Sequence, residues 1–281
     1  MEELNSTPPK NLAESFGLAG LTQFDTSPGV TPRTTNVYHV TYTPGAKEIV
    51  LFFWGCNLAC RWCYRQKNIH SLMLEEYINV PNEEPVNWAS PPTKFLTFDE
   101  VMALFEGREV KHVVMEGAEA ALDPLYPEIA RELHRRYGTH NILLTNALQL
   151  PDDLSHTDSI EISLKAMDDD LHIAHTGKSN KVILENFKKL HESGMKLIVE
   201  SVFVPGLVDI EETERMAEFI ASIDRTIPFI ILPHIRTLGN SWQRPTPEDM
   251  EKVGVVARKH LDKVFCVRGD EKPIYETIKL V

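Results

Sequence analysis

Three cysteines follow one short apolar stretch of the chain. Cys56, Cys60 and Cys63 come directly after residues 48–54, with the spacing C-x3-C-x2-C. Three thiolates on one short loop can coordinate three irons of a four-iron cluster and leave the fourth iron without a protein ligand, whereas electron-transfer clusters usually have four cysteine ligands. The spacing therefore favours a [4Fe-4S] cluster with one iron open to a further molecule.

Two other interpretations of the cysteines remain open. His70 or Cys266 could complete a zinc site, or the three cysteines could be small buried apolar side chains. Zinc sites built from cysteine typically take C-x2-C pairs from two separate loops, and the chain has no second pair. The iron–sulfur interpretation is therefore preferred.

The cysteine spacing, with Trp62 just before the last cysteine, resembles the signature of the radical S-adenosylmethionine (SAM) superfamily. The resemblance implies that the amino and carboxylate groups of SAM chelate the open iron, and that an electron splits the S–C5′ bond of SAM. It also implies a reductant such as ferredoxin or flavodoxin, and a 5′-deoxyadenosyl radical that takes hydrogen from a substrate. Trp62 would lie near the adenine or shield the cluster.

A second motif follows the next apolar stretch. Residues 115–120 read Met-Glu-Gly-Ala-Glu-Ala and resemble the superfamily's Gly-Gly-Glu-Pro turn with two substitutions. In the family this turn holds the amino group of SAM, which implies that role for Gly117 and Glu119. Ala118 stands at the second glycine of the motif, so its φ angle must not be positive.

Further along the chain the match narrows to the pyruvate formate-lyase activating enzyme family, which activates glycyl-radical enzymes. The likeness runs in order from about Gly45 to Val267. Its pieces are Leu-Lys at 164–165, an acidic stretch at 168–170 that we interpret as a solvated turn, Leu-His at 171–172, Thr-Gly-Lys-Ser-Asn at 176–180, Val-Pro-Gly-Leu-Val-Asp at 204–209, Leu-Pro-His at 232–234 and Leu-Gly at 238–239.

The resemblance assigns SAM contacts residue by residue. They are Trp62, Gly117, Ala118, Glu119, Thr145, Asn146, Ser163, Lys165, Glu200, Val202 and His234, the last shifted by one position from the family's ribose-facing histidine.

Three further positions depart from the family pattern. Leu144 replaces an aspartate that helps the family to bind a monovalent cation, so that cation loses a ligand. Ser163 also replaces an aspartate, and its hydroxyl can bond SAM without bringing a charge. Glu200 lies near a family arginine, so its strand would favour a cation or a hydrogen-bond donor instead of an anion or a peptide carbonyl.

The elements that must position these residues alternate from Asn36 onward between short apolar runs and amphipathic stretches, a pattern typical of parallel β/α units. Such units predict an α/β fold, an open partial (β/α)6 parallel barrel of the radical SAM type, with its chemistry at the carboxyl ends of the strands. The expected strands are 48–54, 112–115, 141–144, 159–163, 197–204 and 229–232, and the expected helices are 97–105, 124–137, 180–193, 210–223 and 246–260.

Composition sets the remaining limits. Residues 1–35 predict a loosely ordered arm before one radical SAM domain over residues 36–281. A net charge of −12 argues against a broad phosphate-binding surface and so against nucleic acid as a partner. The apolar runs are too short to cross a membrane, and four cysteines, three of them within eight residues, fit a reducing compartment better than a disulfide framework. We therefore expect a cytoplasmic protein.

Three functional hypotheses follow. The first is an activase-like radical SAM enzyme, an oxidoreductase that works under anaerobic conditions and takes hydrogen from a glycine of a partner enzyme or from another peptide. The second is a radical SAM enzyme that acts on a small molecule or a nucleotide. The third is a metal-bound binding or electron-transfer protein. The ordered motifs favour the first hypothesis.

Overall fold

The computed structural model describes residues 33–66, 68–78, 89–236 and 242–281. Most of the expected N-terminal arm, residues 1–32, and the Leu-Gly motif at 238–239 lie outside this range. Residues 33–35 contact the domain, since the hydroxyl of Thr35 donates a hydrogen bond to the carbonyl of Leu96 (2.7 Å).

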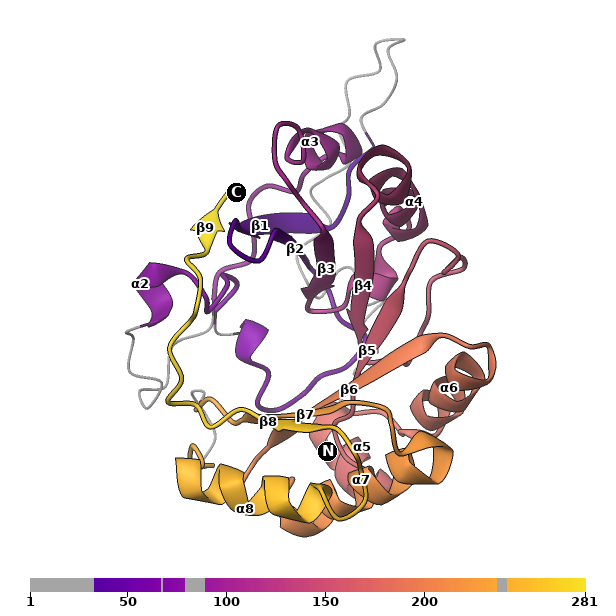
Figure 1. Cartoon of the computed structure of the whole chain (residues 1–281), viewed down its shortest axis with the longest axis vertical. Coiled ribbons are helices and arrows are strands. Elements are labelled where there is room, and N and C mark those ends of the chain that lie inside the picture. Colours follow the sequence, from indigo (N-terminus) through magenta and orange to yellow (C-terminus); the bar gives the residue numbers. More distant parts are fainter. Residues whose placement is uncertain (1–32, 67, 79–88, 237–241) are drawn as a thin grey trace, which may run out of the picture. The chain divides into compact units, whose positions relative to one another are not determined.

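The described residues form a nine-stranded sheet with the order β8-β7-β6-β5-β4-β3-β2-β1-β9 (Figure 1). Neighbouring strands from β2 to β8 are parallel, whereas β1 is antiparallel to β2 and to β9. The strands are β1 (Val37–Thr43), β2 (Glu48–Phe53), β3 (His112–Gly117), β4 (His140–Thr145), β5 (Ser159–Ser163), β6 (Lys196–Phe203), β7 (Phe229–Pro233), β8 (Val264–Cys266) and β9 (Ile278–Lys279).

The six expected strands are confirmed as β2 to β7, and with them the parallel α/β architecture. The sheet adds β1, β8 and β9. Both β8 and β9 are too short to give a readable periodicity. In β1 the polar residues His39 and Thr41 are buried like their apolar neighbours, which removes the alternation that marks a half-buried strand.

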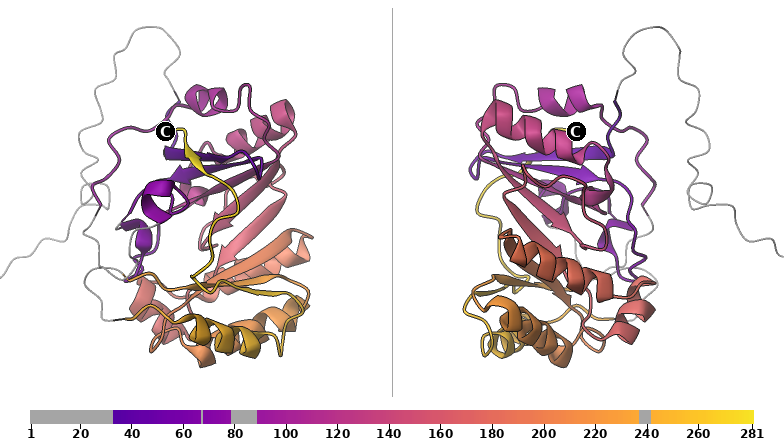
Figure 2. Two further views of the ribbon diagram at one scale, coloured as in Figure 1. Left: turned by 60° about the vertical axis from the view of Figure 1, so that its left-hand side comes forward. Right: turned by 90° about the vertical axis from the view of Figure 1, so that its right-hand side faces the viewer.

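Helices cover the outer face of the curled sheet (Figures 1 and 2). Thr97 and Glu100 form a capping box at the start of α3, and α4 ends at Gly138 with a left-handed φ of 62°. The five expected helices are present, and α2 and α5 are additional. The helices are α2 (Glu75–Ile78), α3 (Phe98–Ala103), α4 (Tyr126–Tyr137), α5 (Asp169–Thr176), α6 (Lys181–Glu192), α7 (Ile210–Asp224) and α8 (Pro247–Ala257), with 3-10 turns η2 (Tyr64–Gln66) and η3 (Ala120–Leu122).

Alternate residues of the parallel strands face opposite sides of the sheet. Met115, Ile162 and Val199 are fully buried in the core that also contains apolar side chains of the helices. Their direct neighbours in sequence point to the other side, into the barrel interior, and most of them are only partly buried. Among them are Glu116, Glu161 and Glu200. The interior of the barrel therefore combines carboxylates with apolar side chains such as Leu144 and Val202, while the layer under the helices is apolar.

The C-terminal segment crosses the open side of the barrel from β8 to β9 (Figure 2). There β9 pairs with β1, and Thr277 forms a bridge with Leu74. A ring nitrogen of His39 lies 2.5 Å from the carbonyl oxygen of Val281. The chain end thus joins the two edges of the sheet. Across the described residues, every helix is too short or too polar to span a bilayer.

Candidate active site

The cysteine loop leaves the carboxyl end of β2, where Gly55 turns the chain with a φ of 97°. Cys56 is exposed, and Cys60 and Cys63 are partly buried. Burial raises the pKa of the Cys60 thiol to about 12, although Lys165 nearby acts to lower it. The thiol is therefore neutral until a metal displaces its proton, as metal binding to cysteine requires.

Helix α5 holds one side of this loop. The backbone N–H of Ala59 donates to the carbonyl of Thr176 (2.9 Å), and that of Arg61 donates to the carbonyl of His175 (3.1 Å). These carbonyls belong to the last turn of α5, whose acceptors have no partner within the helix. Both peptide groups flank Cys60, so the end of α5 fixes the middle of the loop.

The acidic stretch 168–170, interpreted from the sequence as a solvated turn, is instead the start of α5. Asp168 is the N-cap residue, and its side chain accepts a hydrogen bond from the N–H of Leu171 (2.8 Å). Asp169 and Asp170 occupy the first helical turn, where negative charge is favoured by the helix dipole. The interpretation was wrong because a three-residue acidic run suits a helix start as well as a turn.

Asn146 holds the other side of the loop. Its side-chain amide donates to Oδ1 of Asn57 (2.8 Å) and lies 3.7 Å from Sγ of Cys56. Its backbone N–H donates to Oε2 of Glu119 (2.8 Å). Asn146 therefore connects the cysteine loop to the turn after β3.

That turn depends on a close backbone approach. Gly117 has a φ of 120°, and a Cβ at this position would lie 2.5 Å from the carbonyl oxygen of Phe53. The N–H of Ala118 donates to the same oxygen (3.0 Å), and the φ of Ala118 is not positive, as predicted. The turn is thus fixed against the last residue of β2, directly before the cysteine loop.

Glu119 is buried at the end of this turn. Its Oε1 accepts from the N–H of Ala121 (3.2 Å) while its Oε2 accepts from Asn146. Burial raises the pKa of the carboxyl to about 7, and these hydrogen bonds limit the rise. The carboxylate joins two strand ends, and its contact with SAM stays a prediction.

A short polar chain links the ends of β5 and β6. Lys165 Nζ donates to the hydroxyl of Ser163, which in turn donates to Oε1 of Glu200 (2.9 Å). Val202 lies two residues after Glu200 on β6 and is paired with Leu232 of β7. At the end of β4, the hydroxyl of Thr145 accepts a hydrogen bond from the N–H of Ala147 (3.0 Å). Lys165 also acts electrostatically on the Cys60 thiol and lowers its pKa.

Three carboxylates, of Glu116, Glu161 and Glu200, lie on the interior faces of β3, β5 and β6. Glu116 pairs with Arg65 (2.7 Å) from the segment after the cysteine loop. Burial raises the pKa of Glu161 to about 8, with Glu200 and Glu116 as additional causes. These positions were not picked out from the sequence apart from Glu200, yet Glu161 precedes Ser163 by two residues and so shares its face.

Aromatic rings close the site behind the loop. Trp62 is buried and stacks on the ring of His175 with 14° between the planes. His234 and Trp242 meet the indole edge to face, with ring centroids at 6.4 and 6.1 Å. The predicted pair Trp62 and His234 is therefore brought together, and His175 is a further member that the sequence did not reveal.

The donor set fits an iron–sulfur cluster. The loop presents three thiols, faces Lys165, and is lined by His175, whose ring nitrogens have no partner among the described residues. In the same residues, no three His, Cys, Asp or Glu side chains are grouped to hold a single metal ion. Cys266 lies on β8, where its thiol donates to the carbonyl of Met250 (2.8 Å). The zinc interpretation thus gains no support from the described residues.

Comparison with known proteins agrees with this geometry. The chain is 29% identical over 231 residues to the pyruvate formate-lyase-activating enzyme of Staphylococcus epidermidis, covering 75% of this chain and 83% of that protein. It is 26% identical over 227 residues to a Methanocaldococcus jannaschii protein whose name provisionally assigns it to the glycyl-radical enzyme activating enzymes, covering 78% and 80%. The solved structure of TYW1 with a lysine-pyruvate adduct bound shares the fold, with a TM-score of 0.54 at 16% identity over 85% of this chain and 81% of that one.

Residues 50–220, more than half of the chain, match the model of the radical SAM superfamily. The match begins within β2 and extends into α7, so it includes the cysteine loop, the turn after β3 and the polar ends of β4 to β6. The protein is therefore an enzyme of the radical SAM superfamily.

Proposed function

We propose that Cys56, Cys60 and Cys63 hold a [4Fe-4S] cluster and that SAM binds at its open iron. The observation that carries the proposal is a three-thiol loop anchored on both sides, by α5 and by Asn146, at the carboxyl end of a parallel sheet. When bound, the cluster supplies the electron that splits SAM into methionine and a 5′-deoxyadenosyl radical. The protein supplies orientation and exclusion of water.

The side chains around the loop divide these tasks. Lys165 offers a cation for the carboxylate of SAM, and Ser163 offers a hydroxyl beside it. The turn of Gly117 and Glu119 offers backbone acceptors and a carboxylate for the SAM amino group. Trp62 and His234 form an aromatic wall against which the adenosine would rest.

The proposed substrate is a glycine in a partner protein, taken from the activating-enzyme relatives whose similarity covers three quarters of the chain. A hydrogen atom would pass from this glycine to the deoxyadenosyl radical. A reductant such as ferredoxin or flavodoxin would supply the electron. We place the enzyme in the cytoplasm of an anaerobic cell, where a reduced cluster of this kind survives.

Anaerobic reconstitution with iron and sulfide tests the first part. The protein should take up about four irons, show the broad absorbance of a [4Fe-4S] cluster and, once reduced, change its EPR spectrum when SAM is added. Reduced protein with SAM should release 5′-deoxyadenosine and methionine in equal amounts. Protein that binds one zinc and releases neither product would refute the proposal.

The substrate class needs a separate experiment. Reduced protein and SAM are incubated with a purified glycyl-radical enzyme from the same organism, and the sample is frozen for EPR. A glycyl-radical doublet, together with one 5′-deoxyadenosine per radical formed, supports activation. If no glycyl-radical enzyme gives the doublet while a small metabolite accelerates 5′-deoxyadenosine release, the substrate is a small molecule instead.

A further inference from the structure

His175 is a buried histidine whose ring makes no hydrogen bond among the described residues. The residue is 2% exposed, and both ring nitrogens are unpaired. Burial and the nearby Lys165 lower its pKa to about 3, so the ring is neutral, with one N–H donor and one lone pair. Buried polar groups of native proteins nearly always have partners, so an unpaired donor of this kind calls for a ligand.

The ring lies against the cysteine loop. It stacks on Trp62, the residue before Cys63, and the His175 carbonyl accepts from the N–H of Arg61, the residue after Cys60. Backbone and side chain of one residue thus contact the loop between its second and third cysteines. A group bound by these cysteines would lie beside the ring.

The charges around His175 indicate what that group must be. The groups that face it electrostatically are, in order, Lys165, His172, Arg61 and His234, all cationic or neutral. Lys165 also acts on the thiols of Cys56 and Cys60. Among the described residues, the groups that act most strongly on His175 include no acidic side chain, whereas Glu119 acts on Cys56 from the side of the loop that Asn146 holds.

A four-iron cluster with three thiolate ligands is an acceptor with negative charge. Its sulfides and thiolates carry net negative charge, which increases on one-electron reduction. SAM is a weaker candidate for this position, because its adenine is uncharged and its carboxylate already has Lys165 and Ser163 within reach on the strand ends.

We propose that His175 donates one ring N–H to a sulfur atom of the cluster held by the cysteine loop and thereby raises the reduction potential of the cluster. The inference rests on the proposed function, because it needs the cluster to be present. A donor stabilises the reduced state more than the oxidised state, since the reduced state carries more negative charge. The hydrogen bond makes the cluster easier for an external one-electron donor to reduce.

The reduction potential of the reconstituted protein without SAM tests this inference. The EPR signal of the reduced cluster is followed during a dye-mediated titration with dithionite. His175→Leu should lower the equilibrium constant for one-electron reduction of the cluster by about tenfold, which is a fall of about 59 mV in its reduction potential. His175→Gln keeps an N–H donor and should retain most of the wild-type potential.

His172 provides the matched control on the same helix. It is 1% exposed, and its Nδ1 lies 2.6 Å from the carbonyl of Lys178, whereas its Nε2 has no partner among the described residues. It therefore differs from His175 in having one ring nitrogen bonded within the protein. His172→Gln should lower thermal stability and leave the potential unchanged. A potential that falls equally in the His172 variant would overturn the inference, because the shift would then report damage to α5.

Wild-type protein with 15N-labelled histidine gives a second readout that needs no variant to fold. Pulsed EPR of the reduced cluster should show a weakly coupled histidine nitrogen that is absent in His175→Gln. No coupled histidine nitrogen, or a His175→Leu protein with full cluster and unchanged potential, would refute the hydrogen bond. A wild-type protein that takes up no cluster at all would instead refute the proposed function.

Discussion

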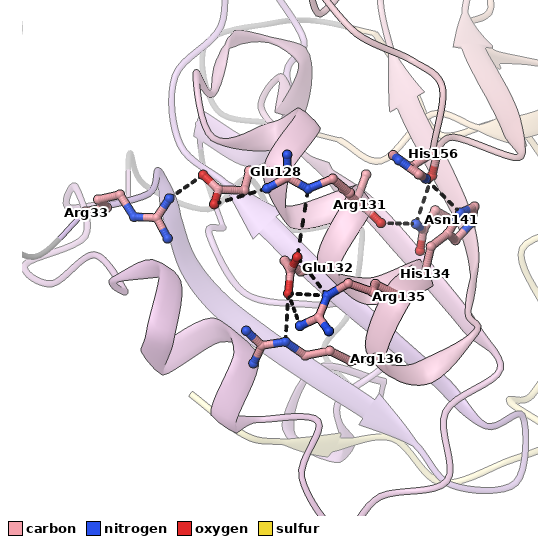
Figure 3. A network of polar contacts seen from close by, with 10 residues as sticks. Arg33, Glu128, Arg131, Glu132, His134, Arg135, Arg136, Asn141 and His156 are labelled. Carbon is pink, nitrogen blue, oxygen red and sulfur yellow. Dashed lines mark hydrogen bonds and ion pairs between the residues drawn. The ribbon is translucent and has the colours of Figure 1, made fainter.

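Carboxylates on the surface of α4 and carboxylates in the interior of the barrel differ in their partners and in the direction of their pKa shifts. On α4, Glu132 accepts hydrogen bonds from Arg135 (2.7 Å) and Arg136 (2.9 Å), and Glu128 pairs with Arg33 and Arg131 (Figure 3). Each charge in this network has one or more opposite partners and borders water. The pKa of Glu132 is accordingly lowered, to about 2, chiefly by its hydrogen bonds to Arg135 and then Arg136.

In the barrel interior, burial instead raises the pKa of Glu116 and of Glu161. Glu161 has no salt bridge among the described residues, and Glu116 and Glu200 add to the effect of burial on its pKa. Both ring nitrogens of His175 also have no hydrogen-bond partner in the part of the chain that the structure describes. Buried polar groups without partners are tolerated where a bound ligand supplies the missing hydrogen bond or charge. The contrast therefore separates polar residues that stabilise the fold from polar residues that would contact a ligand.

Among the variants considered, loss of Cys60 should have the largest effect on the site. Cys60→Ala should reduce bound iron by more than about tenfold and abolish release of 5′-deoxyadenosine, because the cluster loses one of three ligands. Iron analysis and product assay measure both effects. Cys266→Ala, which removes a thiol on β8 that bonds to Met250, should change neither. Full iron content in Cys60→Ala would contradict the ligand assignment.

Gly117→Ala should be the next most damaging change, through the backbone. The new Cβ would lie 2.5 Å from the carbonyl oxygen and 2.6 Å from the nitrogen of Phe53, at a φ of 120°. We expect the free energy of unfolding to fall by about 3 kcal/mol or more, measured by urea denaturation. Gly107→Ala is the control, since its φ is also positive (72°) but its Cβ would meet no atom within 4 Å. Its cost should be about 1–2 kcal/mol. Equal costs would show that the contact with Phe53 is unimportant.

The sequence predicted the frame of the molecule well, because strands β2 to β7 are apolar runs separated by amphipathic helices and turn residues. It missed α5 because the eight residues after Asp168 lack a clear apolar periodicity, and their acidic start also suits a turn. Strands β8 and β9 are defined by pairing across the sheet edges, which no local pattern reports.

The site could be predicted as far as its motifs extend. The thiol loop, Asn146, Lys165 and His234 lie at one end of the sheet as expected from their positions after strands. The contact of Glu119 with two backbone N–H groups, and the stack of His175 on Trp62, arise from packing between segments distant in sequence. Such contacts require the fold before they can be inferred.

The effect of Glu161→Gln on stability should depend on pH, which tests the contrast between the barrel interior and the surface of α4. The folded pKa of Glu161, about 8, lies above the ordinary value of 4.5, so folding favours its protonated form. Its contribution to stability is fully present below the ordinary value and is lost as the pH rises through about 8. At about pH 9 the variant should be more stable than wild type by roughly 1–3 kcal/mol, and at about pH 5 the two should be equal.

Urea denaturation at both pH values measures this difference. Glu109→Gln is the matched control, because Glu109 is exposed and its pKa is lowered by Lys47, so its effect should be small and of opposite sign. A Glu161→Gln protein that is less stable than wild type at about pH 9 would mean that the carboxylate has a favourable partner in the interior.

Glu132→Gln on α4 should have the smallest effect on stability, and that effect should disappear at high salt. The lowered pKa of Glu132 means that its contribution is present above the ordinary value of 4.5 and is lost as the pH falls toward 2. At neutral pH the melting temperature should fall by less than about 2 °C, because water and the remaining pairs of the network replace the lost contact. Raising the salt from about 0.1 M to about 1 M shortens the screening length from about 10 Å to about 3 Å and should erase the difference. A larger, salt-independent loss would show that the α4 network supports the fold as firmly as the buried contacts do, and the contrast with the interior would then fail.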